Sequence, residues 1–177
     1  MNDRKRYIVP LPGGRSLELG ARTLVMGILN VTPDSFADGG LRFDPARAID
    51  HGLQMMADGA DILDVGGEST RPGAEALDTE EELRRILPVV ERLAGAGATV
   101  SVDTYKATVA REAVQCGADV INDISGLQFD PELGRAVAET GAALVLMHNR
   151  GRSDEMYRHA EYDNVPAEVG AELRLAM

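Results

Sequence analysis

Polar side chains end three apolar runs of this sequence, and they are the first candidates for chemistry. Asn30, Asp103 and Asn122 each follow residues that would form a buried strand. A carboxylate matches two parallel N–H donors on a flat heterocycle, and an amide offers both a donor and an acceptor. An amide oxygen also suits Mg²⁺, which keeps several waters and takes other ligands from phosphate. Side chains of these types at strand ends are candidates for binding a polar ligand, and the amide oxygen of Asn30 is a candidate metal ligand.

The same residues also have structural interpretations. Asp and Asn at strand ends often cap the following helix, which would explain Asp103 and Asn122 without a ligand. Asn30 would then organise the turn at residues 31–33 through side-chain bonds to the backbone. Asp64 lies inside an apolar run, and we interpret it as a structural residue that orients neighbouring polar groups.

Two loops carry further candidates. The loop at residues 68–73 contains Arg71, a cation that can bind phosphate or carboxylate through two parallel bonds. In the alternative interpretation, Arg71 is a solvated residue of an ordinary turn. The loop at residues 34–40 carries Phe36 and Asp38 and ends in two glycines. The glycines permit hinge motion and Phe36 is suited to excluding water, so we expect this loop to act as a mobile lid.

A degenerate repeat would place the polar residues at one edge of a sheet. A Gly-Ala pair followed by an apolar run begins at residues 59, 97, 117 and 141. Glycine suits the left-handed position that follows a helix, so each pair marks the passage from helix to strand. Apolar side chains at spacings of three and four predict the intervening helices. These are expected at residues 45–60, at 79–93 after a capping box that begins at Thr79, at about 106–116, from Asp130 to just before Gly141, and at about 166–177.

Strand and helix alternate five times, beginning with a strand at residues 23–30, and this alternation requires a parallel sheet. The sheet can be a closed (β/α)₈ barrel or an open doubly wound sheet. Polar groups at nearly every strand end favour the barrel, where they converge on one mouth. Residues 7–11 and 16–19 flank a Pro-Gly-Gly turn and predict a β-hairpin ahead of the barrel. Because a barrel usually needs ~250 residues, we expect residues 1–177 to form one domain that is incomplete at its C-terminal end and holds the first five βα units.

The composition argues against several classes of protein. The net charge of −11 disfavours nucleic acid and anionic membranes as partners. No apolar run approaches the ~18 residues of a membrane span, and no long apolar region follows the charged N-terminus, as it would in a secretory signal. The single cysteine, Cys116, excludes an internal disulfide, and the three histidines lack zinc-ligand spacing. These features predict a soluble, cytoplasmic protein.

The segments Leu24–Phe36 and Ile62–Gly73 together closely resemble the two signature motifs of the dihydropteroate synthase family. That family condenses 6-hydroxymethyl-7,8-dihydropterin diphosphate with p-aminobenzoate, which releases pyrophosphate and forms 7,8-dihydropteroate. The resemblance implies a TIM-type (β/α)₈ barrel, Mg²⁺ as cofactor, these two small-molecule substrates, and a possible homodimer of the full-length protein.

The resemblance also implies a role for each candidate residue. Asp103 and Asn122 would bind the pterin, and Asn30 would contact the magnesium ion. The remaining assignments are Ile124 and Met147 as walls of the pterin pocket, Thr70 at the substrate diphosphate, Arg71 and Pro72 beside the p-aminobenzoate pocket, and Phe36 and Asp38 in the substrate loop. Later motifs of the family lie beyond the end of this chain, including a lysine that meets the pterin and an Arg-x-His that binds the diphosphate. The 177-residue chain is therefore expected to be inactive on its own.

Two other functions remain open. A methyltetrahydrofolate-binding methyltransferase domain would have a similar barrel and pterin pocket. Residues 68–73 argue against it, because they imply handling of a diphosphate and an arylamine. The second alternative is a non-catalytic fragment that only binds a pterin or assembles with another chain.

Overall fold

The computed structural model describes residues 4–32, 44–68, 77–151 and 161–177. Within them, five parallel strands form one sheet in chain order. The strands are β3 (Met26–Asn30), β4 (Ile62–Gly66), β5 (Thr99–Asp103), β6 (Val120–Asp123) and β7 (Ala143–Leu146). The helices that follow them in turn are α2 (Pro45–Ala57), α3 (Thr79–Gly95), α4 (Ala107–Gln115), α5 (Leu133–Thr140) and α6 (Val165–Ala176).

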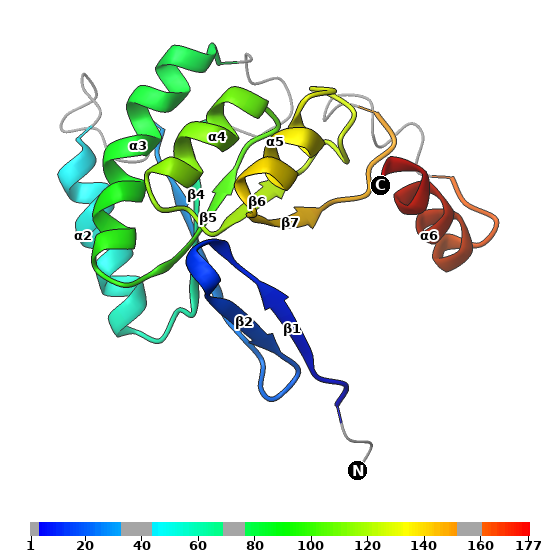
Figure 1. The fold of residues 1–177 in the computed structure, drawn as a ribbon, viewed down its shortest axis with the longest axis horizontal. Coiled ribbons are helices and arrows are strands. Elements are labelled where there is room, and N and C mark those ends of the chain that lie inside the picture. Colours follow the sequence, from blue (N-terminus) through cyan, green and yellow to red (C-terminus); the bar gives the residue numbers. More distant parts are fainter. Residues whose placement is uncertain (1–3, 33–43, 69–76, 152–160) are drawn as a thin grey trace.

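Helices α2 to α5 cover one face of the sheet, and successive strands lie side by side without a reversal of order (Figure 1). In a doubly wound sheet, helices cover both faces and the strand order reverses. The arrangement is therefore that of five consecutive units of a (β/α)₈ barrel. This confirms the fold class predicted from the sequence.

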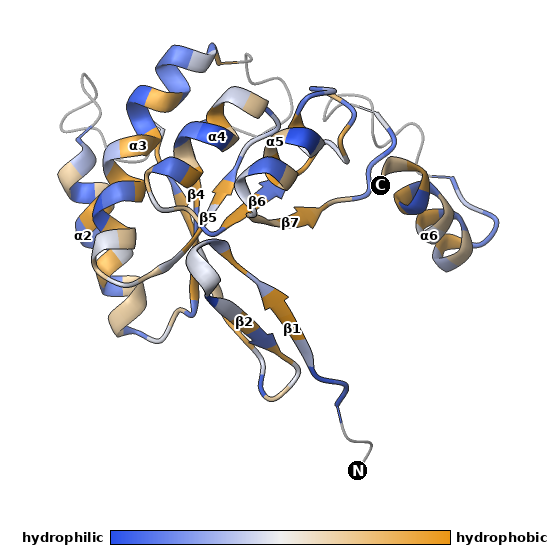
Figure 2. Ribbon diagram, viewed as in Figure 1, coloured by the Kyte–Doolittle hydropathy of each residue, from blue (hydrophilic) through white to orange (hydrophobic). Residues whose placement is uncertain are grey.

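The apolar core lies between the sheet and these helices. Side chains alternate between the two faces of a strand, and Leu29, Val65 and Val102 on the helix-facing side are fully buried. They belong to one cluster with Val90 and Leu93 of α3. In Figure 2, β7 is mainly hydrophobic, β6 ends in hydrophilic residues, and the helices mix hydrophobic with hydrophilic residues. Among the described residues, none of the helices is both long and apolar enough to span a lipid bilayer.

The opposite, inner face of the sheet differs from the helix-covered face. Ile28 on β3 is 64% exposed and Val145 on β7 is 43% exposed, although both are apolar. Between them, at the centre of the inner face, Asp64 and Ser101 are buried and polar. The inner face thus combines apolar flanks with a polar centre, whereas the outer face is mainly apolar, with Asp123 buried at the end of β6.

An antiparallel hairpin precedes the sheet, as the sequence predicted. Its strands are β1 (Tyr7–Pro10) and β2 (Ser16–Leu19), joined through the short helical turn η1 (Pro12–Gly14). Figure 1 shows the hairpin in blue, projecting from the sheet. Arg15 Nη1, next to this turn, lies 2.9 Å from Asp119 Oδ1, directly before β6. The ion pair fixes the hairpin at the amino-terminal edge of the sheet.

Aspartates that follow two of the Gly-Ala pairs link neighbouring strands at this edge. They are Asp61 and Asp119. Asp61 Oδ2 accepts the backbone N–H of Val25 at 2.9 Å, and Asp119 Oδ2 accepts that of Val100 at 3.2 Å. Arg22 pairs with Asp61 as Arg15 does with Asp119. Each aspartate therefore joins its own strand to the preceding one and to the N-terminal segment.

Several predicted boundaries differ from the structure: α2 ends at Ala57 rather than residue 60, and α3 runs to Gly95 rather than residue 93. At three further points a side-chain hydrogen bond accounts for the difference. The first barrel strand begins at Met26 rather than residue 23, since the N–H of Val25 is bonded by an Asp61 carboxylate. The cap of α3 is Asp78 rather than Thr79, and its side chain accepts from Glu81 N at 2.9 Å. Helix α5 begins at Leu133 rather than Asp130. The reason is that the two oxygens of the Asp130 carboxylate accept hydrogen bonds from different places: one from Glu132 N and the other from Ala107 N, the first N–H of α4.

Candidate functional site

One continuous row of residues crosses the carboxyl ends of the strands. Parallel pairing places Asn30 opposite Gly66, Gly66 opposite Asp103, and Asp103 opposite Asn122. Residues paired in this way have side chains on the same face of the sheet, here the inner face. The structure therefore brings together three residues that the sequence predicted as binding residues: Asn30, Asp103 and Asn122.

Gly66 leaves the space between two of these side chains open. A methyl group at this position would lie 3.5 Å from Asp103 Cβ, 3.7 Å from Asp103 Oδ2 and 3.8 Å from Asn30 Oδ1. These are ordinary van der Waals distances, so the methyl group would fit without strain. It would, however, fill the region that both polar groups border. The missing side chain keeps this part of the row accessible.

Asp103 occupies the centre of the row, at the last position of β5. Burial raises the pKa of its carboxyl group to about 7, and the negative charges of Asp64, Glu82, Glu68 and Asp123 add to the effect. Among the described residues, none donates a hydrogen bond to this side chain. N–H donors from a ligand would supply the missing partners and favour the ionised form.

Asp103 does not cap the helix that follows it. The first backbone N–H of α4, at Ala107, donates to Asp130 Oδ2 at 2.8 Å. The N–H of Lys106 donates to Thr104 Oγ1 at 3.2 Å. The capping interpretation of Asp103 is therefore wrong, because other side chains carry out that task.

Asn122 is likewise not the residue that organises the turn after its strand. The neighbouring Asp123 accepts the backbone N–H of Ser125 at 2.7 Å and that of Leu127 at 2.6 Å. Asp123 is fully buried on the helix-facing side. Asn122 is partly exposed on the inner face, with its side chain not used in the turn.

Asp64 links Asn122 to the inner strands. Its Oδ2 accepts from Asn122 Nδ2 at 2.9 Å, and its Oδ1 accepts from Ser101 Oγ at 2.6 Å. Asp64 lies two residues before Gly66 on the same face of β4, so it forms the floor beneath the row. Three neighbouring strands, β4, β5 and β6, are joined by these two side-chain bonds.

Ile124 and Met147 lie beside the Asn122 end of the row. They follow β6 and β7 by one residue each. The N–H of Met147 donates to the carbonyl of Asp123 at 3.0 Å, and the carbonyl of Ile124 accepts from Asn149 Nδ2 at 2.5 Å. Met147 is 39% exposed. Their placement is compatible with the predicted apolar walls of a pocket.

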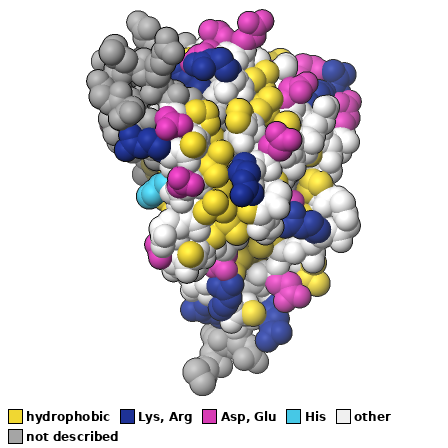
Figure 3. Space-filling model, turned by 90° about the vertical axis from the view of Figure 1, so that its left-hand side faces the viewer, with side chains coloured by type: hydrophobic (Ala, Val, Ile, Leu, Met, Phe, Trp, Pro, Cys, Tyr) yellow, Lys and Arg dark blue, Asp and Glu magenta, His cyan; other side chains and the backbone are white. Residues whose placement is uncertain are grey.

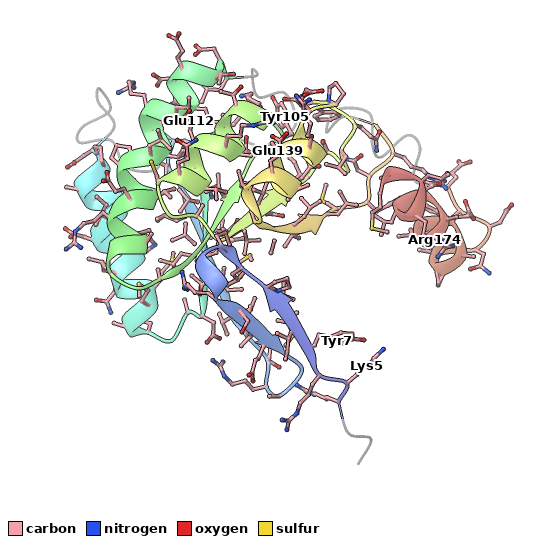
Figure 4. All side chains as sticks on the ribbon, in the orientation of Figure 1. Lys5, Tyr7, Tyr105, Glu112, Glu139 and Arg174 are labelled. Atoms are coloured by element: carbon pink, nitrogen blue, oxygen red, sulfur yellow. The ribbon has the colours of Figure 1, made fainter. Side chains whose placement is uncertain are left out.

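A second polar cluster, which sequence reasoning missed, lies close to the row. Lys106 Nζ donates to Glu68 Oε2 at 2.7 Å, to Glu82 Oε2 at 2.5 Å and to the carbonyl of Leu77 at 2.6 Å. The hydroxyl of Tyr105 donates to Glu68 Oε1 at 2.9 Å, and Figure 4 labels Tyr105 where β5 leads into α4. The cluster holds Glu68 and Leu77 together, the described residues on either side of residues 69–76. One sequence signal was available: Glu82 lies on the apolar stripe of α3, where a charged residue needs a partner.

Several predicted residues lie outside the described part of the chain. They are Phe36, Asp38, Thr70, Arg71 and Pro72. Within the described ranges, no group of three His, Cys, Asp or Glu side chains is placed to hold a metal ion. Asn30 contributes one amide oxygen, which fits Mg²⁺ only where waters and ligand phosphates complete the coordination.

A groove on the outer side of the molecule is separate from the row. It lies between α2 and α3, on the other side of these helices from the inner face. Figure 3 views this side and shows hydrophobic side chains among acidic and basic ones. The groove is lined by Ala46, Ile49, Asp50, Pro88, Glu91, Arg92 and Gly95. It shares no residue with the row and is not part of the candidate site.

The fold defines a protein of the (β/α)₈-barrel class, and the row of polar side chains at the carboxyl ends of its strands is the candidate site. The family model described as "Pterin binding enzyme" matches residues 26–177. The chain belongs to this family of pterin-binding enzymes.

Individual relatives agree with this assignment. The chain is 55% identical over 150 residues to the dihydropteroate synthase of Mycobacterium leprae, an alignment that covers 84% of this chain and 53% of the relative. Dihydropteroate synthase of Yersinia pestis, solved as a sulfonamide drug complex, superposes with a TM-score of 0.83 at 43% identity and covers 93% of this chain and 60% of that one. The enzyme of Xanthomonas albilineans in complex with 7,8-dihydropteroate superposes with a TM-score of 0.77 at 44% identity. This match covers 94% of this chain and 58% of that one. The chain spans about half the length of the curated relatives it matches.

Proposed function

We propose that the protein carrying this chain is a dihydropteroate synthase. It would condense 6-hydroxymethyl-7,8-dihydropterin diphosphate with p-aminobenzoate to give 7,8-dihydropteroate and pyrophosphate. The observation that carries the proposal is the strand-end row of Asn30, Asp103 and Asn122 in a member of the pterin-binding family. The Xanthomonas relative, which binds 7,8-dihydropteroate, supports this choice of product.

Recognition of the pterin would centre on Asp103. A pterin presents its 2-amino group beside a ring N–H, and these two parallel donors match the two oxygens of one carboxylate. The carboxyl group of Asp103 lacks donors among the described residues, and its pKa of about 7 leaves it near the balance between its two protonation states at neutral pH. Ligand N–H groups would stabilise the ionised form. Asn122 would contact a further part of the heterocycle, with Ile124 and Met147 beside the ring.

The reaction is a substitution at the pterin methylene carbon, in which the arylamine replaces the diphosphate. The C–O bond to the diphosphate breaks, a C–N bond to the arylamine forms, and the amine loses a proton. Mg²⁺ bound with the substrate would neutralise the departing pyrophosphate, with Asn30 Oδ1 as its protein ligand. The proposal also assigns roles to residues of two loops: Thr70 would contact the diphosphate, Arg71 and Pro72 the p-aminobenzoate, and Phe36 and Asp38 would belong to the substrate loop. We further propose that the protein forms a homodimer and is located in the cytoplasm.

The direct test is product formation by the whole gene product that contains these residues. Supplied with the pterin diphosphate, p-aminobenzoate and Mg²⁺, it should form 7,8-dihydropteroate, and the unphosphorylated pterin should give none. The alternative methyltransferase function makes the opposite prediction: affinity for 5-methyltetrahydrofolate without turnover of the pterin diphosphate. That result would replace the proposal.

A variant at Asn30 separates the metal role from pterin binding. Asn30→Ala should weaken binding of the pterin diphosphate and spare the unphosphorylated pterin, as measured by calorimetry. The defect should shrink when the Mg²⁺ concentration is raised, because mass action partly compensates for a weaker site. An equal loss for both ligands that does not respond to Mg²⁺ would exclude Asn30 as the metal ligand.

A further inference from the structure

The side-chain amide of Asn122 has two ends of nearly the same shape and opposite chemistry. The oxygen accepts hydrogen bonds, whereas the nitrogen donates two. An ionised carboxylate only accepts. Because Asp64 Oδ2 lies 2.9 Å from the amide, the nitrogen end faces Asp64. The reverse orientation would set the amide oxygen against a carboxylate oxygen.

Asp64 itself is firmly held. Its second oxygen accepts from Ser101 Oγ at 2.6 Å, and the exposed fractions of Asp64 and Ser101 are 5% and 0%. Both residues lie within strands β4 and β5 rather than in loops. Groups fixed by strand packing and by second hydrogen bonds orient a neighbour more closely than a loop residue can. Asn122, at the edge of this network, is partly exposed and close to Asp103.

We propose that Asp64 is a positioning residue for ligand recognition, which fixes the Asn122 amide with its oxygen turned away from Asp64. Asp64 thereby sets the order in which Asn122 presents its acceptor and its second N–H to a heterocycle. From the sequence, Asn122 could present these groups in either order. The inference rests on the proposed function, because it concerns the heterocycle bound beside Asp103.

A double-mutant cycle on the whole gene product tests this role, with 6-hydroxymethylpterin as the probe and calorimetry as the measurement. Asp64→Asn keeps the size of the side chain and removes the charge that dictates the orientation of Asn122. This variant and Asn122→Ala should each weaken binding about tenfold, the loss expected for one well-placed hydrogen bond. The double variant should bind no more weakly than Asn122→Ala, because Asp64 acts through Asn122.

Two further measurements distinguish positioning from a merely structural role. Ser101→Ala removes the other bond to Asp64 but leaves the Asn122 contact, so it should change affinity by no more than about threefold. The side-chain amide signal of Asn122 in a ¹⁵N NMR spectrum should shift in Asp64→Asn and stay close to its place in Ser101→Ala. Thermal unfolding of each variant checks that the fold is retained.

The outcomes separate this inference from the proposed function. If the wild-type protein does not bind the pterin probe, or if Asp103→Ala binds it equally well, the proposed pterin site is wrong. If wild-type binding depends on Asp103 but the effects of Asp64→Asn and Asn122→Ala multiply, Asp64 does not act through Asn122. An unchanged amide signal in Asp64→Asn would also overturn the positioning role.

Discussion

Two acidic clusters near the end of β5 differ in whether a cation balances them. In the first, Glu68 and Glu82 share the ammonium group of Lys106, at 2.7 and 2.5 Å. In the second, Asp64 and Asp103 lie close together, and the described residues place no cation beside either one. Each cluster is largely removed from water. In the second cluster, burial and the neighbouring negative charges raise the pKa of the Asp103 carboxyl group to about 7.

The difference indicates separate tasks. A buried carboxylate with a salt-bridge partner has its hydrogen-bonding needs met, and loss of the partner is costly. The Lys106 cluster is complete in this sense, and it ties α3 and β4 to the start of α4. Asp103 is a buried carboxyl group to which no described residue donates a hydrogen bond, and its pKa is raised. Groups with a shifted pKa are common at functional sites. The first cluster is therefore structural, whereas the second is suited to a ligand that brings its own N–H groups.

The largest expected effect is on stability, in Lys106→Met. This variant would leave Glu68 and the 1%-exposed Glu82 without their cation. The free energy of unfolding of the gene product should fall by about 3–5 kcal/mol, measured by urea denaturation. The control is Arg84→Met, which removes an exposed ion pair with Glu81 and should cost no more than ~1 kcal/mol. Equal losses in the two variants would contradict the structural role of the cluster.

The second effect is on binding. Asp103→Ala should weaken binding of 6-hydroxymethylpterin by at least ~10-fold, because each bond to a charged group contributes about 1.5–3 kcal/mol. The stability of the fold should not fall, since no described residue depends on this carboxyl group for a hydrogen bond. Asp103→Asn should rescue binding poorly, because its amide nitrogen would face a ligand donor. Asp58→Ala, at an exposed carboxylate, is the matched control and should leave the affinity unchanged. Unchanged affinity in Asp103→Ala would remove this residue from the site.

The smallest effect is the pH dependence of stability. The pKa of Asp103 is raised in the folded protein, so between pH ~4 and ~7 the folded state holds a proton that the unfolded state has released. Stability in the absence of ligand should therefore fall as the pH rises through this window. Asp64, Glu68, Glu82 and Asp123 are the charged groups that strengthen this effect.

The comparison with Asp103→Asn isolates this contribution. The variant has no titrating group at position 103 and should lack that part of the slope. The gap between the two stability curves should change by at least ~1 kcal/mol across the window, since one pKa unit corresponds to about 1.4 kcal/mol. Parallel curves for wild type and variant would show that the pKa of Asp103 is not raised.

The sequence predicted the parts of the molecule that depend on local signals. Apolar runs that end in polar residues located Asn30, Asp103 and Asn122 at the carboxyl edge of a parallel sheet, and the pairing register places all three in one row. Alternation of strand and helix predicted the fold class. The short range of these signals is the reason for their success, because periodicity and caps act within one element.

Contacts between distant residues could not be predicted in this way. Asp64 and Asn122 are 58 positions apart, and Lys106 and Glu82 are 24 positions apart. Their partners are set by strand register and by the packing of α3, which no single segment encodes. Glu82 was assigned to a capping box, but its side chain instead binds Lys106. The raised pKa of Asp103 likewise depends on burial and on four separate acidic residues.

The ion pairs of the N-terminal segment have a consequence for the order of folding. Arg22 and Asp61 are separated by 39 positions, whereas Arg15 and Asp119 are separated by 104. Contacts between residues far apart in the chain form slowly, because a long loop must first close. Arg22 can find its partner once β4 has joined β3, but Arg15 must wait until β6 has been added to the sheet. The hairpin precedes the sheet in the chain but docks only after β6 has been added, so a probe on it would report the late steps of folding.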